Sequence, residues 1–350
     1  IIKLKDNYEI YVVSFSDGKH KKLSGVNYIQ IGFDRKINIF KDTKFFFKFS
    51  YLIYKIKPQV IFTITPKISF LISFTNIFFK ITRVHFFTGQ FWYNKVGLKK
   101  FIFKNIDLFI QNRSNLCFVD SKSQLEFLIE NGFNKKKIKL IHNGSMSGVD
   151  SSKFLPNLSF KNSFKDNYNI DSDTLILLFM GRVTKDKGIY ELLFLYEKLL
   201  NDNFKVKLVL AGLDEELIIN KISLKNKKLY DKLIYLGHIE NPDQIIPIAD
   251  IFILLSKREG FGLSIIEASS CSIPIIANNI VGLRDSVSDN KTGILIDNFD
   301  NFRDYNKIKK LISDNNLRKN LGENGRLYVK KYFEKKDVIN YLYSELINFI

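Results

Sequence analysis

Short runs of β-branched and aromatic residues alternate along the chain with longer stretches of helical period, and this alternation predicts parallel α/β layers. In the first half, strands are expected at 9–15, 26–31, 59–64, 82–87, 115–119 and 138–141, and helices at 41–56, 66–80, 95–110 and 121–131. In the second half, strands are expected at 174–180, 206–211, 233–236, 251–255, 274–277 and 293–296, and helices at 187–200, 241–249, 263–271, 302–313, 316–331 and 335–349.

A polar stretch at 143–172 separates the two series of elements. It carries Gly144, Gly148 and Pro156 and shows no sustained hydrophobic period, which is typical of a connection between domains. A length of 350 residues also favours two domains over one. The predicted units are an N-terminal domain at 1–150, a C-terminal domain at 151–334, and a last helix at 335–350 that can return to the N-terminal domain.

The net charge of +18 favours an anionic partner, such as nucleic acid, a phospholipid surface or a phosphorylated small molecule. However, Lys is abundant here together with Asn, Ile and Phe, as in proteins from AT-rich genomes, so the charge alone does not select a partner. Cys117 and Cys271 lie too far apart to form a disulfide framework, which favours a reducing compartment. The four histidines are too scattered to predict a metal site, and the apolar run 68–79 is too short to span a membrane.

The segment 180–188 places two cations after a buried strand. The strand ends at Met180, Gly181 turns the chain, and a helix is expected to begin near Lys187. Ligands of open α/β sheets bind beyond the carboxyl ends of the strands, where Arg182 and Lys187 would lie. Both could be solvated loop charges, but the glycine at the strand end favours a phosphate site.

The segment 250–277 places two glycines and two acids around the start of a second helix. A buried strand leads into a loop with Gly260 and Gly262, and the helix that follows can receive an anion at its free amides. Those amides belong to Gly262, Leu263 and Ser264. Glu259 precedes the loop and Glu267 lies inside the helix, and a carboxylate can accept hydrogen bonds from vicinal hydroxyls. A helix-dipole role would explain Glu259 better than Glu267, which sits in an otherwise apolar helix.

These motifs together resemble the donor site of retaining glycosyltransferases of family 4, which have the GT-B fold of two Rossmann-like domains with parallel sheets facing across a cleft. The matching motifs are Gly181-Arg182, Lys187-Gly188, Glu259-Gly260-Phe261-Gly262 and Glu267-Ala268. Asn143-Gly144 and the segment around Gly293 also match, so the resemblance covers nearly the whole chain from Tyr8 on. The combination is specific, although each motif alone would be weak.

The resemblance implies a role for each matching residue. Arg182 and Lys187 would bind the donor diphosphate and stabilise its departure, and Glu259 would contact the transferred sugar. Glu267 would take the ribose hydroxyls. The implied donor-binding residues are Gly181, Arg182, Lys187, Gly260, Phe261, Gly262, Leu263 and Glu267. The family needs neither a divalent metal nor another cofactor, and a UDP-sugar is the expected donor substrate.

The N-terminal domain contributes one further candidate and one departure from the family. His85 lies in the segment 83–90, and family members often carry a histidine at this strand end that faces the donor sugar, so His85 is predicted to be catalytic together with Glu259, Arg182 and Lys187. A lone histidine is as easily a structural residue. The first strand of the family and its glycine-rich loop have no counterpart in this sequence, so we expect the N-terminal domain to lack its first strand, which puts the activity of the chain in doubt.

Basic amphipathic segments of the N-terminal domain suggest where the protein works. Segments 41–57 and 95–104 mix Lys with aromatic and aliphatic residues, as helices on anionic bilayers do, although sheet-covering helices can share this pattern. The resemblance extends to bacterial enzymes of surface-polysaccharide assembly, through segments 84–90 and 143–150. We therefore expect a cytoplasmic protein at the inner face of the membrane, with a glycan or polyprenyl-linked acceptor.

Three alternatives to this hypothesis remain at the level of the sequence. A nucleic-acid-binding protein would explain the charge, but no recognisable nucleic-acid-binding module is present and Lys is spread along the whole chain, so no nucleic-acid partner is expected. A sugar-nucleotide epimerase could share the fold, since a fold does not fix an activity. A non-catalytic fragment would follow from the missing first strand.

Overall fold

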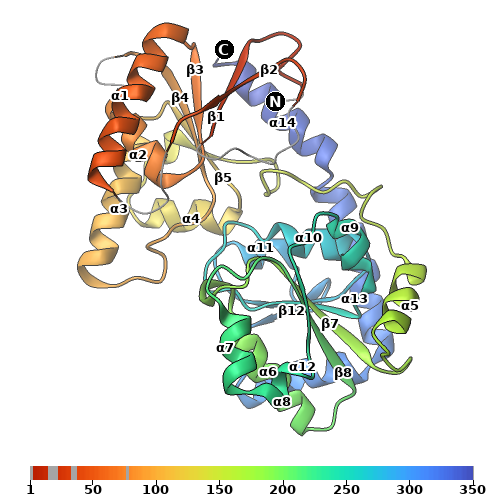
Figure 1. The fold of residues 1–350 in the computed structure, drawn as a ribbon. Helices are drawn as coiled ribbons and strands as arrows, with labels where there is room; N and C mark the ends of the chain where they lie inside the picture. The colour runs from red at the N-terminus through yellow and green to blue at the C-terminus, as the bar shows by residue number, and fades with distance from the viewer. Residues whose placement is uncertain (1–2, 15–22, 33–37, 76–78, 350) are drawn as a thin grey trace.

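The computed structural model describes residues 3–14, 23–32, 38–75 and 79–349, and builds two α/β domains on parallel sheets (Figure 1). The N-terminal strands are β1 (Ile10–Ser14), β2 (Val26–Gln30), β3 (Val60–Thr63), β4 (Thr82–Phe87), β5 (Leu116–Val119) and β6 (Ile138–Leu140). Strands β3 to β6 form a four-stranded sheet in that order, and β1 pairs with β2 alone. Every strand pair is parallel, as the alternating pattern predicted.

Helices cover both faces of the four-stranded sheet. They are α1 (Ile39–Ile56), α2 (Pro66–Thr75), α3 (Gly97–Asn112) and α4 (Lys122–Glu130), with the short turn η1 (Lys135–Lys137). Helix α1 begins where the Asn38 side chain accepts from the amide of Lys41, and it buries Phe45, Phe49 and Ile53 at a spacing of four residues. The last helix of the chain, α14 (Lys335–Ile347), packs against the other face, where Val338 joins the cluster of β4 and β5.

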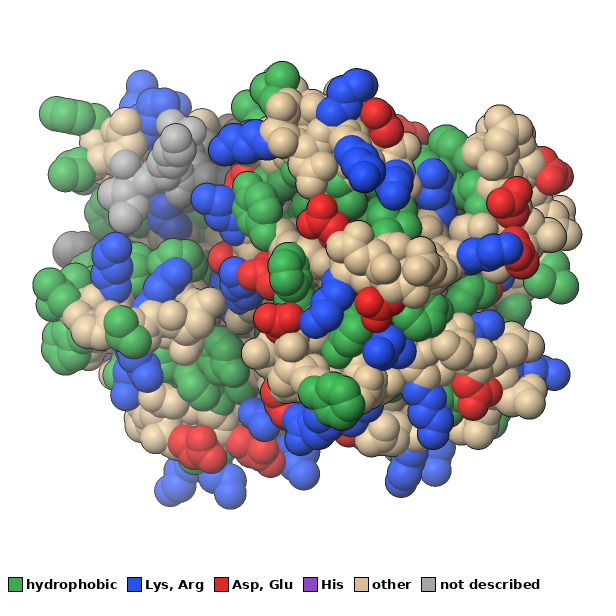
Figure 2. All heavy atoms as spheres, turned by 90° about the horizontal axis from the view of Figure 1, so that it is seen from below, with side chains coloured by type: hydrophobic (Ala, Val, Ile, Leu, Met, Phe, Trp, Pro, Cys, Tyr) green, Lys and Arg blue, Asp and Glu red, His purple; other side chains and the backbone are tan. Residues whose placement is uncertain are grey.

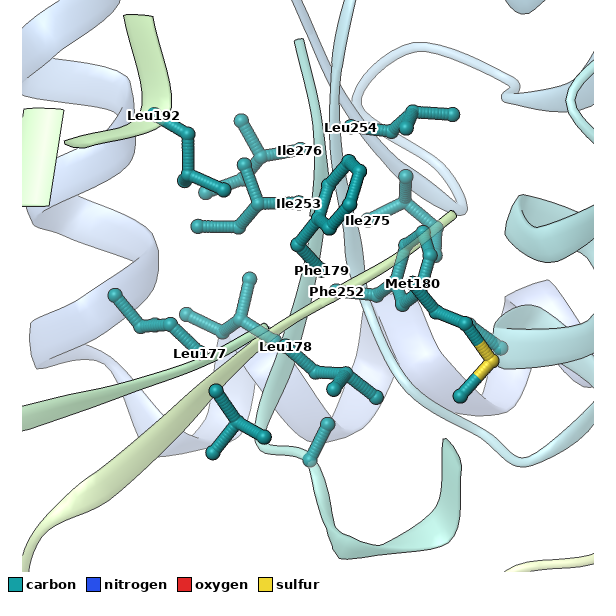
Figure 3. Packing of buried hydrophobic residues seen from close by; sticks show 14 of the residues in the cluster. Leu177, Leu178, Phe179, Met180, Leu192, Phe252, Ile253, Leu254, Ile275 and Ile276 are labelled. Atoms are coloured by element: carbon teal, nitrogen blue, oxygen red, sulfur yellow. The ribbon is translucent and has the colours of Figure 1, made fainter. Parts of the chain in front are cut away.

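The C-terminal sheet has the order β12-β11-β10-β7-β8-β9. Its strands are β7 (Leu175–Met180), β8 (Val206–Ala211), β9 (Ile234–Gly237), β10 (Ile251–Leu254), β11 (Ile275–Asn278) and β12 (Gly293–Ile296). The direction of strand succession reverses between β7 and β10, and ligands of such sheets bind in the crevice at this point. Figure 3 shows the apolar side chains of β7, β10 and β11 packed together, with Leu192 of the neighbouring helix against them.

The helices of the C-terminal domain differ in part from the prediction. They are α5 (Leu158–Asn167), α6 (Ile189–Asn201), α7 (Ile218–Lys225), α8 (Lys227–Tyr230), α9 (Pro242–Ile245), α10 (Leu263–Ser270), α11 (Leu283–Ser286), α12 (Phe302–Ser313) and α13 (Asn315–Tyr332), with turns η2 (Lys185–Lys187) and η3 (Ile246–Ile248). The predicted crossover contains α5, which was not predicted because its sequence is mostly polar and shows little helical period. The helix nevertheless buries Phe164. The predicted helix 187–200 begins two residues later, because Gly188 adopts a left-handed conformation between η2 and α6.

Two crossing segments join the domains. The amide of Val149 donates to the carbonyl of Phe333 at 2.8 Å, and the amide of Lys335 donates to the carbonyl of Val149 at 2.9 Å. This short parallel bridge ties the connection after β6 to the one before α14. Among the described residues, no helix combines the length and the apolar character that crossing a bilayer requires.

Candidate active site

The two predicted phosphate ligands lie after β7, at the switch point of the C-terminal sheet. The Arg182 side chain is half exposed, and its Nη1 donates to Glu215 Oε2 at 2.9 Å. Lys187 ends η2, is largely shielded from solvent, and forms an ion pair with Glu259. Gly188 lets this turn approach β10, because a Cβ atom there would lie 1.9 Å from the carbonyl oxygen of Leu255. The structure therefore brings together Lys187 and Glu259, which are 72 residues apart in the sequence.

Glu259 stands at the entrance to α10. Ser256, two residues after β10, donates from its hydroxyl to Glu259 Oε1 at 2.8 Å, so both a cation and a hydroxyl hold this carboxylate in place. Gly262 caps α10 with a φ of 90°, a left-handed conformation that favours glycine. The N-terminal amides of α10 begin three residues after Glu259, and such a terminus attracts anions.

Phe261 and Glu267 occupy different surroundings from the loop residues. Phe261 is buried, with its ring 5.0 Å from that of Phe333. Glu267 lies in the second turn of α10, and burial raises its pKa to about 7, against an opposing effect of Lys153. Lys153 is itself paired with Asp243 of α9 at 3.2 Å. Glu267 thus faces the side of the domain where α9 follows β9, and not the Lys187–Glu259 pair.

The structure corrects the placement predicted for His85. This residue lies inside β4, is fully buried, and its Nδ1 is 2.9 Å from Thr63 Oγ1 and 3.1 Å from Ser69 Oγ. Burial lowers the pKa of His85 to about 3, so the imidazole is neutral. Its side chain points between the sheet and α2, because alternate residues of a strand point to opposite faces. His85 therefore does not face the cleft, and the residues at this strand end are Thr88, Gly89 and Gln90.

The N-terminal domain meets the Glu259–Gly260 segment through its backbone. A Cβ atom on Gly89 would lie 3.0 Å from the amide nitrogen of Gly260, and one on Gly260 would lie 2.7 Å from the carbonyl carbon of Thr88. The distance at Gly260 is shorter than Cβ atoms tolerate, while Gly89 combines a tight contact with a φ of 105°, so both sides of the contact favour glycine. The two domains therefore touch at the loop that carries the predicted sugar contact.

Sequence reasoning missed a polar contact that links the domains beside this loop. The amide of Ser123 in α4 donates to Asp285 Oδ2 at 3.1 Å, and the amide of Gly282 donates to the Ser123 hydroxyl at 2.9 Å. It also missed Asp120, a buried acid directly after β5, whose pKa burial raises to about 7. Asp120 follows a buried strand directly, and that position was the available signal, whereas Asp285 lies inside the short helix α11 and had no comparable signal.

A cavity of about 820 Å³ lies between the domains. Its walls include Lys122 and Asn143 from the N-terminal domain and Arg284, Tyr328 and Tyr332 from the C-terminal domain. None of the predicted site residues lines it. The carboxyl ends of β7 and β10 remain the better candidate for the reaction, because the charged groups converge there.

Comparison with known proteins places this arrangement in a family. Residues 160–328 match the family described as Glycosyl transferases group 1. The chain is 28% identical to the capsular polysaccharide biosynthesis glycosyltransferase CapM of Staphylococcus aureus, over 99% of this chain and 91% of that protein. It is 25% identical to an N-acetylgalactosamine-N,N'-diacetylbacillosaminyl-diphospho-undecaprenol 4-alpha-N-acetylgalactosaminyltransferase of Campylobacter jejuni, over 73% of this chain and 67% of that protein.

Solved structures show the same fold at low sequence identity. Anabaena Alr3699/HepE in complex with UDP-glucose aligns with a TM-score of 0.80 at 16% identity, covering 97% of this chain and 91% of that one. WaaG, a glycosyltransferase involved in lipopolysaccharide biosynthesis, aligns with a TM-score of 0.74 at 13% identity, covering 96% and 90%. The predicted fold, two Rossmann-like domains of the GT-B type, is confirmed.

Proposed function

Because this chain carries a Glycosyl transferases group 1 domain and is a glycosyltransferase, we propose that it moves a hexose or N-acetylhexosamine from a nucleoside-diphosphate sugar to a glycan in surface-polysaccharide synthesis. The expected donor is a UDP-sugar, and the transfer is proposed to retain the anomeric configuration. The family match favours the transferase over the epimerase. The observation that carries the proposal is the Lys187–Glu259 pair, held at the β7–β10 switch point beside the start of α10.

The pairing of charges suggests how the donor is handled. Lys187 and Arg182 both have carboxylate partners, so an incoming diphosphate competes with Glu259 and Glu215 for these cations. Transfer of Lys187 to the phosphate would release Glu259 to accept a hydrogen bond from a sugar hydroxyl. Two cations and the α10 amides then stabilise the charge that develops on the leaving group. In this proposal they supply the positive charge that a divalent metal supplies in other enzymes, so neither a metal nor a cofactor is required.

Glu267 is proposed to hold the ribose. Glu267 lies in the second turn of α10, near Lys153 and Asp243, whereas Glu259 lies in the loop before that helix, so the two acids are available for different parts of the donor. A carboxylate there can accept from both ribose hydroxyls at once. The transferred sugar and the nucleoside would thus be recognised by different acids.

The acceptor is proposed to be lipid-linked, which requires contact with the membrane. The name of the Campylobacter relative specifies a diphospho-undecaprenol acceptor. In this chain the outer face of α1 exposes Phe47, Tyr51 and Tyr54 among exposed lysines, opposite the face that packs on the sheet. Figure 1 shows α1, α2 and α3 side by side on one flank of the N-terminal domain. Such a surface suits an anionic bilayer, to which each Lys contributes about 1 kcal/mol.

The charge elsewhere is less concentrated. Figure 2 shows that, on the face seen from below, Lys and Arg side chains are scattered among acidic and apolar ones. A continuous basic groove of the kind that tracks a nucleic acid backbone is not visible on that face. The scatter of charge on that face supports our proposal that α1 and its neighbours are the membrane-facing region and that the enzyme works at the inner face of the membrane.

The donor proposal is tested by calorimetry with UDP and by hydrolysis of a panel of nucleotide sugars. We expect the wild-type chain to bind UDP and to hydrolyse at least one UDP-sugar slowly, and we expect Arg182→Ala to weaken both. Leu224→Ala, a change to an exposed side chain remote from β7, serves as the control. Absence of binding to every nucleotide and nucleotide sugar in the wild-type protein would refute the proposal.

The membrane proposal is tested by co-sedimentation with vesicles that contain anionic lipid. Lys44, Lys48, Lys55 and Lys57 are changed together to Glu, and the matched control changes four exposed lysines of the C-terminal domain in the same way. The control lysines are Lys225, Lys227, Lys228 and Lys232. We expect only the first variant to lose binding, and wild-type binding to fall with salt. Equal losses in both variants would mean that net charge, and not the α1 surface, holds the protein.

A further inference from the structure

Three buried side chains meet at the carboxyl ends of β4 and β5, on the N-terminal side of the contact between the domains. Gln124 Nε2 donates to Gln90 Oε1 at 3.1 Å, and Gln124 Oε1 accepts from the amide of Asp120 at 2.9 Å. Asp120 is 8% exposed, Gln90 3% and Gln124 not at all. Because Gln124 binds the oxygen end of the Gln90 amide, the orientation of that amide is fixed.

This network leaves one donor and one acceptor without partners. Among the described residues, neither Gln90 Nε2 nor Asp120 Oδ1 has a hydrogen-bond partner, and both atoms are buried. Buried polar atoms without partners cost free energy, so they are uncommon and call for an explanation. A hydroxyl group accepts one hydrogen bond and donates another, so a single hydroxyl could satisfy both atoms.

The two atoms belong to residues that adjoin the proposed donor loop. A Cβ atom on Gly260 would lie 2.9 Å from Asp120 Oδ2, and one on Gly89, the neighbour of Gln90, would lie 3.1 Å from the carbonyl carbon of Glu259. Asp120 and Gln90 are thus covered by the segment whose Glu259 is proposed to contact the transferred sugar. Burial raises the pKa of Asp120 to about 7, with only the Met146 amide acting against it, so the carboxyl has an unmet need for hydrogen-bond donors.

We propose that Asp120 and Gln90 form a subsite for a sugar hydroxyl, in which Asp120 Oδ1 accepts from the hydroxyl and Gln90 Nε2 donates to it. The subsite is reached when the Glu259–Gly260 segment and the Thr88–Gly89 turn move apart. The inference rests on the proposed function, and it adds a recognition element from the N-terminal domain to a donor site built from the C-terminal domain. The hydroxyl can belong to the transferred sugar or to the acceptor sugar, and the test separates these two sources.

Two conservative variants test the subsite in the full chain. Asp120→Asn replaces one carboxylate oxygen, and Gln90→Glu removes the free donor while it keeps an oxygen for Gln124. The matched control is Gln111→Glu, since Gln111 is equally buried but has both ends of its amide paired with the backbone of Asn134. The measurements are UDP affinity by calorimetry, melting temperature, and rates of UDP-sugar hydrolysis and of transfer.

We expect both variants to bind UDP within about twofold of wild type and to lose transfer by about 10- to 100-fold, the loss of one charge-assisted hydrogen bond to substrate. If hydrolysis and affinity for the UDP-sugar fall as well, the hydroxyl belongs to the transferred sugar. If only transfer falls, it belongs to the acceptor. Wild-type transfer in both variants would overturn the proposal. Losses of transfer that only parallel a drop in melting temperature would overturn it too, because that is the behaviour expected of the control Gln111→Glu. Failure of the proposed function is distinct, because the wild-type chain would then bind neither UDP nor a nucleotide sugar.

Discussion

Replacement of Gly260 by alanine isolates the contact between the domains from the chemistry of the donor site. The φ angle of Gly260 lies outside the left-handed region, so alanine is compatible with the local backbone. Its methyl group, however, would lie 2.7 Å from the carbonyl carbon and 2.8 Å from the carbonyl oxygen of Thr88, and 2.9 Å from Asp120 Oδ2. Two of these three atoms belong to the backbone, which cannot rotate away as a flexible side chain does.

The size of the effect follows from the overlap. The contacts fall more than half an ångström short of ordinary carbon separations, which are about 3.5–4.0 Å. Overpacking of this kind typically costs about 1–3 kcal/mol. If that cost is relieved by separation of the domains, the arrangement in which they meet at this loop becomes roughly 5- to 150-fold less populated. Transfer should fall by a similar factor, since it needs both domains.

The assay compares transfer rate, UDP affinity and melting temperature in Gly260→Ala and in the control Gly32→Ala. A Cβ atom on Gly32 meets nothing within 4 Å, so the control makes the same chemical change in open space. We expect Gly260→Ala to lose transfer while it keeps UDP affinity within a few-fold, because the residues proposed to hold the nucleotide belong to the C-terminal domain. Wild-type transfer in Gly260→Ala would show that the reaction does not need this contact. Loss of UDP affinity equal to the loss of transfer would place the damage in the donor site itself.

Four other predictions concern the proposed donor site. Lys187→Ala should lower transfer by about 10²- to 10³-fold while the protein stays folded, because one charge on the leaving group is lost; steady-state kinetics on a full acceptor substrate measures this, and an unchanged kcat contradicts the assignment. Glu267→Gln should weaken UDP binding more at pH 8 than at pH 6, since the raised pKa of about 7 keeps the wild-type carboxyl largely protonated at the lower pH; calorimetry at both pH values shows whether the difference grows. Glu267 contributes to the free energy of unfolding at low pH, and because its pKa is raised to about 7, this contribution is lost as the pH rises through about 7. The difference in melting temperature between wild type and Glu267→Gln should therefore change in that pH window. EDTA should leave transfer largely intact, and full loss that manganese restores would refute the metal-free mechanism.

Local features of the sequence determined the elements that carry the proposed donor site. Strands β4 and β8 have the bounds that their runs of β-branched, aromatic and aliphatic residues predicted, because a buried parallel strand is rich in such residues even where it carries a polar one such as His85 or Lys207. The cations after β7 and the acid before α10 were likewise predictable. In an open α/β sheet the carboxyl end of a strand is the ligand edge, and the glycines at 181, 260 and 262 mark where each strand gives way to a turn.

The local pattern of apolar and polar residues did not predict every helix. Helix α5 escaped prediction because its apolar positions are few and its stability comes from Phe164, which packs into the C-terminal core. In such segments tertiary packing, and not the residues' own period, decides that a helix forms. No element was predicted at α7 and α8 either, although α7 buries Ile218, Ile219 and Ile222 at helical spacing.

Only the tertiary structure decided which polar residues face the cleft. The sequence placed His85 at a strand end, but the pleat of β4 directs its side chain toward Thr63 of β3 and Ser69 of α2, and the packing of these two elements buries it. Asp120 and Gln90 show no local signal beyond their positions after strands. Their proposed role depends on the contact that Gly260 of the other domain makes beside them. The pairing of Lys187 with Glu259 also joins the segments that follow two different strands, β7 and β10. The sequence pattern indicates the period of an element and the residue types at its end. The direction in which a side chain points and the residues that it contacts are decided by packing between elements that are far apart in the chain.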